Sequence, residues 1–274
     1  MRCIENCAAS GDRTEMTTPL FLANFIQSYP NVWSLVVGRV MLALAISLAF
    51  SLLAWGMRAV TGTGAVAGAV ITFIICIAAG PAGFGVLLSV FLLTMFATRF
   101  GLHRKLEAGL AERNSGRDAG QILANLLAAT MVAAPVAILS GNKSLLLAGM
   151  TAAFCEAAAD TVSSEIGQAT GRRAYLITSL RSVPAGTDGA ISATGSIAGV
   201  LAAIVVGAIA SWLDVLRSDW WLIAVGSGIA GTVLDSLLGA TLERDGRLGN
   251  NAVNFLSTTF AACLTLAIGL WKMV

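Results

Sequence analysis

The sequence predicts an all-α protein, a polytopic transmembrane helix bundle of about eight spans. Of its 274 residues, 57% are hydrophobic and only 12% are charged, whereas a soluble domain has about 25% charged residues. Its apolar runs approach the ~20 residues that a helix needs to cross the hydrocarbon core of a bilayer. The short alternating segments of a transmembrane barrel are not seen. The net charge of +2 is too small to indicate a nucleic-acid partner.

The apolar runs divide the chain into a polar N-terminal tail, 1–30, and a transmembrane helical domain, 31–274. The spans are expected at 33–56, 62–80, 84–99, 119–139, 144–166, 189–211, 220–241 and 252–271. Residues 80–83 (GPAG) and 140–143 (SGNK) are typical of tight turns between neighbouring spans. Three longer connectors are expected at 99–118, 167–188 and 242–251.

Positive charge is divided unevenly among the connectors. The first, third, fifth and seventh hold eleven Lys and Arg residues, whereas the others and both tails hold five. Because cytoplasmic loops carry the excess of positive charge, we expect these odd-numbered connectors in the cytoplasm and both termini outside the cell (inner) membrane. All six Trp residues fall at the expected span ends, as an aromatic belt at the membrane interfaces requires.

Four carboxylates lie in the expected spans or at their mouths: Glu156, Asp160, Asp188 and Asp235. Each would cost about 2.5–3.5 kcal/mol if it faced lipid, so all four must face the bundle interior or water. Helical spacing places Glu156 and Asp160 on one face, whereas Glu165, five positions after Asp160, points elsewhere on a continuous helix. Asp235 lies in a stripe of glycines that admits a close partner helix.

Further polar stripes begin at the same ends of other spans. They comprise Arg117, Gln121 and Asn125; Ser192, Gly195, Ser196 and Gly199; and Asn250, Asn254 and Thr258. Every stripe lies at the end of its span next to an odd-numbered connector. The sequence therefore predicts one site at the cytoplasmic face of the membrane.

The connector at 182–189 (SVPAGTDG) is rich in Gly and precedes the expected sixth span. Backbone N–H groups at the start of a helix bind anions, and Arg181 nearby would neutralise a phosphate. No Gly-Lys-Ser/Thr follows, so this is not a Walker A loop. Together with the carboxylates, it predicts a site in which acids hold Mg²⁺ while Arg and N–H groups hold phosphate.

Simpler interpretations exist for each feature. The interior acids can pair with Arg residues and lock the bundle, and the Gly-rich connector can be a structural turn and helix cap. Arg99, Arg104 and Lys105 are interpreted mainly as topology determinants. The Asn and Gln side chains can hydrogen-bond between helices without binding a ligand.

Several short motifs occur in an order that matches a known family. They are 97–101 (ATRFG), 116–125 (GRDAGQILAN), 159–167 (ADTVSSEIG), 183–189 (VPAGTDG), 234–241 (LDSLLGAT) and 250–254 (NNAVN). On these motifs the chain resembles the integral membrane proteins of domain of unknown function 92 over residues ~55–270. That family includes transmembrane protein 19 and the phytyl-phosphate kinases of plants and cyanobacteria.

The resemblance implies a phosphotransferase that moves a phosphoryl group from a nucleoside triphosphate, CTP or ATP, to a prenyl monophosphate such as phytyl phosphate. It implies that Asp160 and Asp235 hold Mg²⁺, with Glu156 or Glu165 assisting. Phosphate and substrate would be held by Arg117, Gln121, Asn125, Ser164, Arg181, Gly186, Thr187, Asp188, Gly189, Asn250 and Asn254.

The alternative is a transporter or flippase of a phosphorylated isoprenoid lipid, for which interior acids and glycine-broken helices are also suited. Alternating access requires polar groups in both halves of the membrane. The outer half of this sequence has no comparable polar cluster, which favours the enzyme.

Overall fold

The computed structural model describes residues 30–110, 116–139, 143–171 and 173–273. The chain divides into two units, 1–41 and 42–274. Helix α2 (Pro30–Gly56) begins in the first unit, and the expected polar tail lies outside the described residues except for its last residue. All other elements belong to the second unit.

The second unit is a bundle of apolar helices, so the expected all-α transmembrane architecture is confirmed. The helices after α2 are α3 (Gly62–Arg99), α4 (Leu102–Glu107), α5 (Ala119–Ala133), η1 (Ala134–Ala137), α6 (Ser144–Ala169), α7 (Ala193–Trp212), η2 (Ser218–Trp220), α8 (Trp221–Leu238), the π-helix η3 (Gly239–Glu243) and α9 (Asn250–Met273). In the described part of the chain, seven helical stretches are long and apolar enough to cross a membrane.

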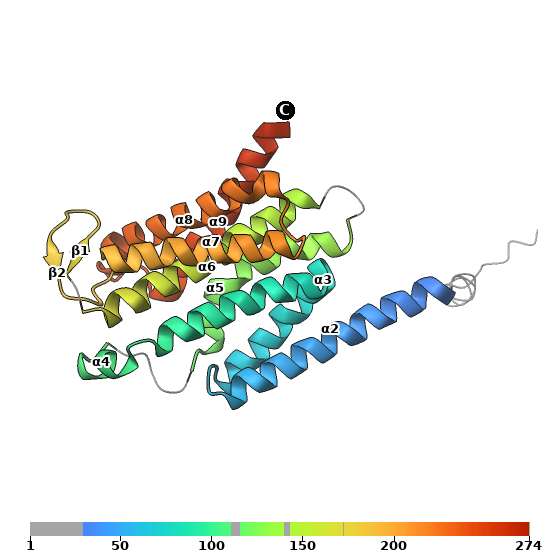
Figure 1. Ribbon diagram of the computed structural model, residues 1–274, viewed down its shortest axis with the longest axis horizontal. Helices are drawn as coiled ribbons and strands as arrows, with labels where there is room; N and C mark the ends of the chain where they lie inside the picture. Colours follow the sequence, from blue (N-terminus) through green and yellow to red (C-terminus); the bar gives the residue numbers. More distant parts are fainter. Residues whose placement is uncertain (1–29, 111–115, 140–142, 172, 274) are drawn as a thin grey trace, which may run out of the picture. The chain divides into compact units, whose positions relative to one another are not determined.

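One of these stretches, α3, contains two crossings. Its 38 residues would extend about 57 Å as a straight helix, almost twice the ~30 Å hydrocarbon core. Gly80 breaks the helix with φ 67° and ψ −167°, and Pro81 follows. Figure 1 shows the ribbon reversing direction at this break. The two halves of α3 therefore supply the second and third of the eight expected crossings.

Helix α6 lies at the centre of the bundle, between glycine-rich faces of α7 and α8. A Cβ on Gly195 would lie 2.5 Å from the Ser163 carbonyl oxygen, and one on Gly199 would lie 2.7 Å from that of Ala159. On the other side, a Cβ on Gly228 would lie 2.6 Å from the Cβ of Cys155. Only glycine permits such close approach, so both neighbours contact the backbone of the helix that carries Asp160.

A small antiparallel sheet precedes α7. It consists of β1 (Ala174–Leu176), β2 (Ser182–Val183) and β3 (Ala190–Ile191), in the order β2-β1-β3, with Ala174 opposite Val183 and Tyr175 opposite Ile191. The expected span start at residue 189 is therefore wrong by several residues. The helix begins after Ser192, whose hydroxyl accepts from Gly195 N at 3.1 Å. Strands of two or three residues are too short for periodicity to reveal.

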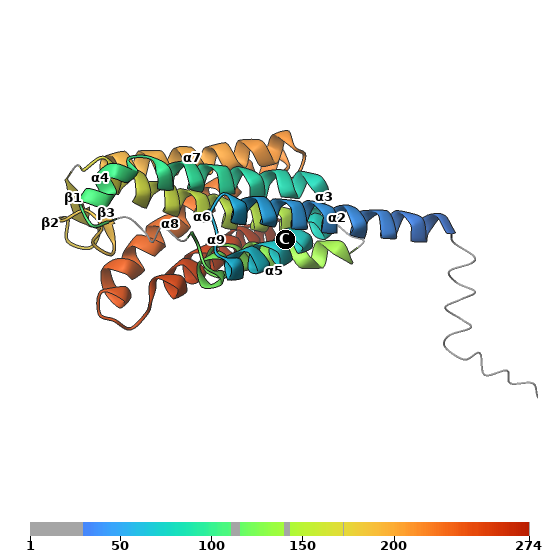
Figure 2. The ribbon, with the colours of Figure 1, turned by 90° about the horizontal axis from the view of Figure 1, so that it is seen from below.

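The two ends of the bundle differ. Figures 1 and 2 both show α4 and the sheet at one end, where α3 ends and α7 begins. The connector after α2 lies at this end too, because Thr61 N donates to the Arg117 carbonyl at 3.0 Å. We call this end of the bundle the connector end. The expected turn at 140–143 lies mostly outside the described residues.

The Trp residues follow the expected belt only in part. Trp55, Trp212 and Trp271 are exposed near the ends of their helices, by 56%, 81% and 80%. Trp220 is instead buried, with the Lys272 ammonium 5.2 Å from its ring centroid. Its role is therefore packing between α8 and α9.

Candidate functional site

A polar cavity of about 350 Å³ opens among helices α5 to α9 at the connector end. Most of the side chains that the sequence singled out line it together. These are Arg117, Gln121, Asn125, Asp160, Ser164, Glu165, Gly186, Thr187, Asp188, Gly189, Asp235, Asn250 and Asn254. Glu156 and Arg181 are not part of the lining.

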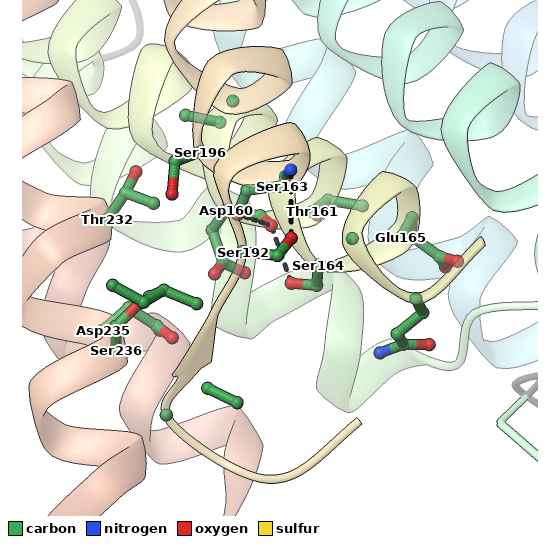
Figure 3. Close-up of a pocket in the computed structure, with 18 of the residues that line it drawn as sticks. Asp160, Thr161, Ser163, Ser164, Glu165, Ser192, Ser196, Thr232, Asp235 and Ser236 are labelled. Atoms are coloured by element: carbon green, nitrogen blue, oxygen red, sulfur yellow. Dashed lines mark hydrogen bonds between the residues drawn. The ribbon is translucent and has the colours of Figure 1, made fainter. Parts of the chain in front are cut away.

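Asp160 on α6 and Asp235 on α8 form the centre of the cavity. Figure 3 shows their side chains on neighbouring helices, and their carboxyl groups lie close enough to share a hydrogen bond when one carries a proton. The Ser257 hydroxyl donates to Asp235 Oδ2 at 3.2 Å. With its amide oriented to satisfy both ends, Asn254 also donates to Asp235 Oδ2, at 3.2 Å. Ser257 and Asn254, both on α9, therefore position Asp235. The sequence pattern did not identify this role of Ser257.

Glu156 lies behind this pair, one helical turn deeper in the bundle. Its side chain is fully buried, and neither carboxylate oxygen has a hydrogen-bond partner in the described part of the chain. It packs against Gly231, where a Cβ would lie 2.6 Å from Glu156 Cγ. A buried carboxyl group without a donor requires a proton or a nearby cation. Glu156 is therefore neutralised either by its own proton or by positive charge at the aspartate pair.

Glu165 is engaged elsewhere. Its Oε2 accepts from Lys105 Nζ, which also donates to the carbonyls of Ala97 at 3.3 Å and Thr98 at 2.7 Å. Figure 3 shows the Glu165 side chain directed away from Asp160 and Asp235. The geometry thus does not bring Glu165 to the aspartate pair, which it was expected to assist. Lys105, interpreted from sequence as a topology determinant, is 1% exposed and ties α4 to α6.

Arg117 is the basic side chain of the cavity lining, and the backbone around it is fixed on both sides. Arg117 N donates to the Ala59 carbonyl at 3.0 Å, and its own carbonyl accepts from Thr61 N. Gly116 has φ 79°, and a Cβ on Gly64 would lie 2.3 Å from the Arg117 carbonyl oxygen. Gly64 was not identified from the sequence. Glycine is required at position 64 because of its contact with Arg117, which lies more than fifty positions away in the sequence.

Three helices begin beside the cavity: α5, α7 and α9. Their N-termini carry partial positive charge and favour anions. Asp118 caps α5 in a reciprocal box, in which Gln121 N donates to Asp118 Oδ1 at 3.0 Å and Asp118 N donates to Gln121 Oε1 at 3.1 Å. Gln121, expected as a substrate ligand, therefore also has a capping role.

Two other expected polar ligands support their own helices. Asn125 Nδ2 donates to the Gln121 carbonyl at 2.8 Å, and the Ser164 hydroxyl donates to the Asp160 carbonyl at 2.8 Å. Both residues line the cavity. The Ser164 oxygen can then only accept, which suits a cation or a ligand hydroxyl, whereas Asn125 keeps both its Oδ1 acceptor and one Nδ2 N–H donor.

The Gly-rich connector forms one wall of the cavity. Gly186 and Gly189 have φ values of 83° and 70°, which non-glycine residues rarely adopt. A Cβ on Gly189 would lie 2.1 Å from Ala240 N, so the connector lies directly against the π-helix. Strand β3 separates this connector from α7. The connector N–H groups therefore do not lie at the start of the helix, which is where the sequence analysis expected them. Arg181 is exposed in this connector and does not reach the cavity lining.

The lining is strongly acidic. It includes five carboxylates (Asp160, Glu165, Asp188, Asp235 and Glu243) and one Arg. A phosphate would be repelled by this surface unless cations accompanied it. Among the described residues, no three or more His, Cys, Asp or Glu side chains lie together in a way that could hold a metal ion. Two carboxylates with open positions are nevertheless what Mg²⁺ uses when substrate phosphates supply other ligands.

Comparison with known proteins identifies a family that matches most of the chain. A family model described as integral membrane protein DUF92 matches residues 45–262. An uncharacterised membrane protein of Synechocystis is 33% identical over 73% of this chain and 78% of its own length. One of Methanocaldococcus jannaschii is 32% identical over 84% and 94%. The chloroplastic protein VTE6 of Arabidopsis thaliana is 29% identical over 68% of this chain and 58% of its own. No solved structure matches the chain.

Proposed function

The chain belongs to the integral membrane family DUF92, and from that premise we propose that it is a prenyl-phosphate kinase. It would transfer a phosphoryl group from CTP or ATP to a prenyl monophosphate, such as phytyl phosphate, to give the diphosphate. The proposal agrees with the motifs shared with a family that includes the phytyl-phosphate kinases.

One observation carries the proposal most directly. Asp160 and Asp235 line the same cavity as Arg117, the Gly-rich connector and the first turns of three helices. Acids together with anion-binding groups are the two parts of a metal-phosphate site. Phosphoryl transfer requires mainly such positioning and charge neutralisation.

Each group has a distinct task in this proposal. Asp160 and Asp235 would hold Mg²⁺, which would neutralise negative charge on the transferred group. Arg117 would bind a phosphate of the donor or the acceptor, in the bidentate geometry that a guanidinium favours. The Gly186–Gly189 backbone would close the cavity over the phosphates and limit access of water. The acceptor is a phosphate that is already anionic, so a strong general base is not required.

The first test is turnover of the purified protein in lipid nanodiscs with prenyl monophosphates, CTP or ATP, and Mg²⁺. Wild type should form the diphosphate, whereas Asp160→Asn and Asp235→Asn should each abolish it. The matched control is Asp245→Asn, which makes the same change to a carboxylate at the connector end that is 61% exposed and outside the cavity lining. Asp245→Asn should retain wild-type activity.

Melting temperature, measured on the same samples, separates chemistry from folding. Stable Asn variants with near-normal turnover would remove both aspartates from the proposed site. Loss of stability with turnover retained in the folded fraction would make them structural ion-pair partners. If wild type forms no diphosphate but moves prenyl phosphate across vesicles, the protein is the alternative, a lipid transporter or flippase.

A further inference from the structure

A second cavity, of about 270 Å³, lies beside the polar one and differs from it in chemistry. Its walls are stripes of apolar residues from α2, both halves of α3, and α5. They include Phe50, Ala54, Ala65, Gly68, Ile71, Leu87, Val90, Phe91, Met95, Ile122 and Leu126. The hairpin at Gly80 creates this space, because it folds the two halves of α3 against each other.

The two cavities share a wall. Arg117, Gln121 and Asn125 line both of them. Arg58 and Arg99 also line the second cavity, at the connector end of α2 and α3. The apolar space thus has cationic side chains at one end, and one of them also faces the aspartate pair. This combination suits a molecule with a hydrocarbon chain and an anionic head.

Two aromatic rings, Phe50 and Phe91, form part of the wall of the second cavity. Phe50 packs edge-to-face on Phe84, with ring centroids 5.3 Å apart, and on Phe91, at 5.0 Å. From Leu87 to Arg99 the cavity follows α3 for twelve residues, about 18 Å at 1.5 Å per residue. A chain that entered at Arg99 would therefore be enclosed over more than half of the ~30 Å hydrocarbon core, and it would contact the Phe91 ring along the way.

We propose that this second cavity holds the hydrocarbon chain of the acceptor lipid, with its phosphate at Arg117 facing Asp160 and Asp235. The inference rests on the proposed function and adds the location of the chain.

Gly68→Leu tests the chain site. A Cβ at Gly68 would meet only the Ser51 hydroxyl, at 3.9 Å, so the backbone tolerates a side chain that then fills the cavity. Turnover is compared for isopentenyl, geranyl and geranylgeranyl phosphate. The variant should lower kcat/KM for geranylgeranyl phosphate by roughly 5- to 150-fold, the range expected for overpacking, and leave isopentenyl phosphate largely unaffected.

The matched control is Gly226→Leu, the same change at a helical glycine of α8 whose Cβ would meet nothing within 4 Å. It should leave the ratio between substrates unchanged. An equal loss for short and long chains in Gly68→Leu, or an equal effect of Gly226→Leu, would overturn the chain site.

A binding measurement separates this inference from the proposed function. A geranylgeranyl phosphate analogue with a photoreactive group near the end of its chain is cross-linked to wild type, and the labelled peptides are identified. Label in 50–72 and 84–99 supports the chain site even if no diphosphate forms. Label confined to α8 and α9 overturns it even if the protein is an active kinase.

Discussion

At the scale of single residues, the structure separates two arginines that the sequence treated alike. Arg117 is held by backbone hydrogen bonds on both sides and lines both cavities, whereas Arg181 is exposed in the Gly-rich connector. Arg117→Ala should therefore weaken binding of prenyl phosphate or nucleotide. Loss of a charged hydrogen bond costs about 1.5–3 kcal/mol, or roughly 10- to 150-fold in affinity.

Arg181→Ala is the matched control, because it removes the same side chain at the same end of the bundle. It should change affinity by less than about twofold, within the effect of an exposed charge. Both variants are measured by titration of wild type and mutant protein with each ligand. An effect of Arg181→Ala equal to that of Arg117→Ala would show that the connector closes over the ligand.

At the scale of elements, the short helix α4 is anchored by one buried ion pair. Lys105 Nζ reaches Glu165 on α6 and two carbonyls at the end of α3. Lys105→Ala leaves the Glu165 carboxylate buried without its partner, a change that costs about 3–5 kcal/mol. We expect a clear fall in the melting temperature of the purified protein.

The double variant Lys105→Met/Glu165→Leu distinguishes an anchor from a ligand. Replacement of a buried pair by apolar side chains of similar volume is often neutral or stabilising, so the melting temperature should recover. Turnover should recover with it, because Glu165 is directed away from the aspartate pair. A stable but inactive double variant would restore Glu165 to the metal site.

At the scale of the whole molecule, the polar cavity, the sheet and the odd-numbered connectors lie at one end of the bundle. The basic residues are concentrated in the same connectors, which predicts that this end is cytoplasmic. In a background without native Cys, His103→Cys, Thr178→Cys and Asp245→Cys should react with an impermeant maleimide only from the cytoplasmic side. Arg217→Cys, in the connector between α7 and α8, should react only from outside.

All four native side chains are exposed, so lack of reaction reflects sidedness and not burial. Reversal of all four positions would place the site outside, away from the cytosolic nucleotide, and would argue against the kinase. A mixed pattern among the three connector-end positions would contradict the helix bundle itself.

The sequence by itself determined the membrane architecture and most of the cavity lining. Both the architecture and the lining follow from patterns within single helices. Apolar runs of span length must cross the bilayer, and Asp160, Asp235, Arg117 and Asn254 all fall at corresponding ends of their spans. An interior carboxylate is too costly to face lipid. Composition and helical periodicity therefore suffice to bring these side chains to one end of the bundle.

Only the tertiary structure decided which of the candidates meet. Glu165 pairs with Lys105, sixty positions away, and Arg181 stays outside the cavity, although both lie within motifs or connectors that the sequence marked. The apolar cavity likewise depends on the reversal at Gly80, which brings the two halves of α3 together. Such contacts join residues far apart in the chain, and local pattern cannot distinguish a side chain that faces a ligand from one that faces a distant partner.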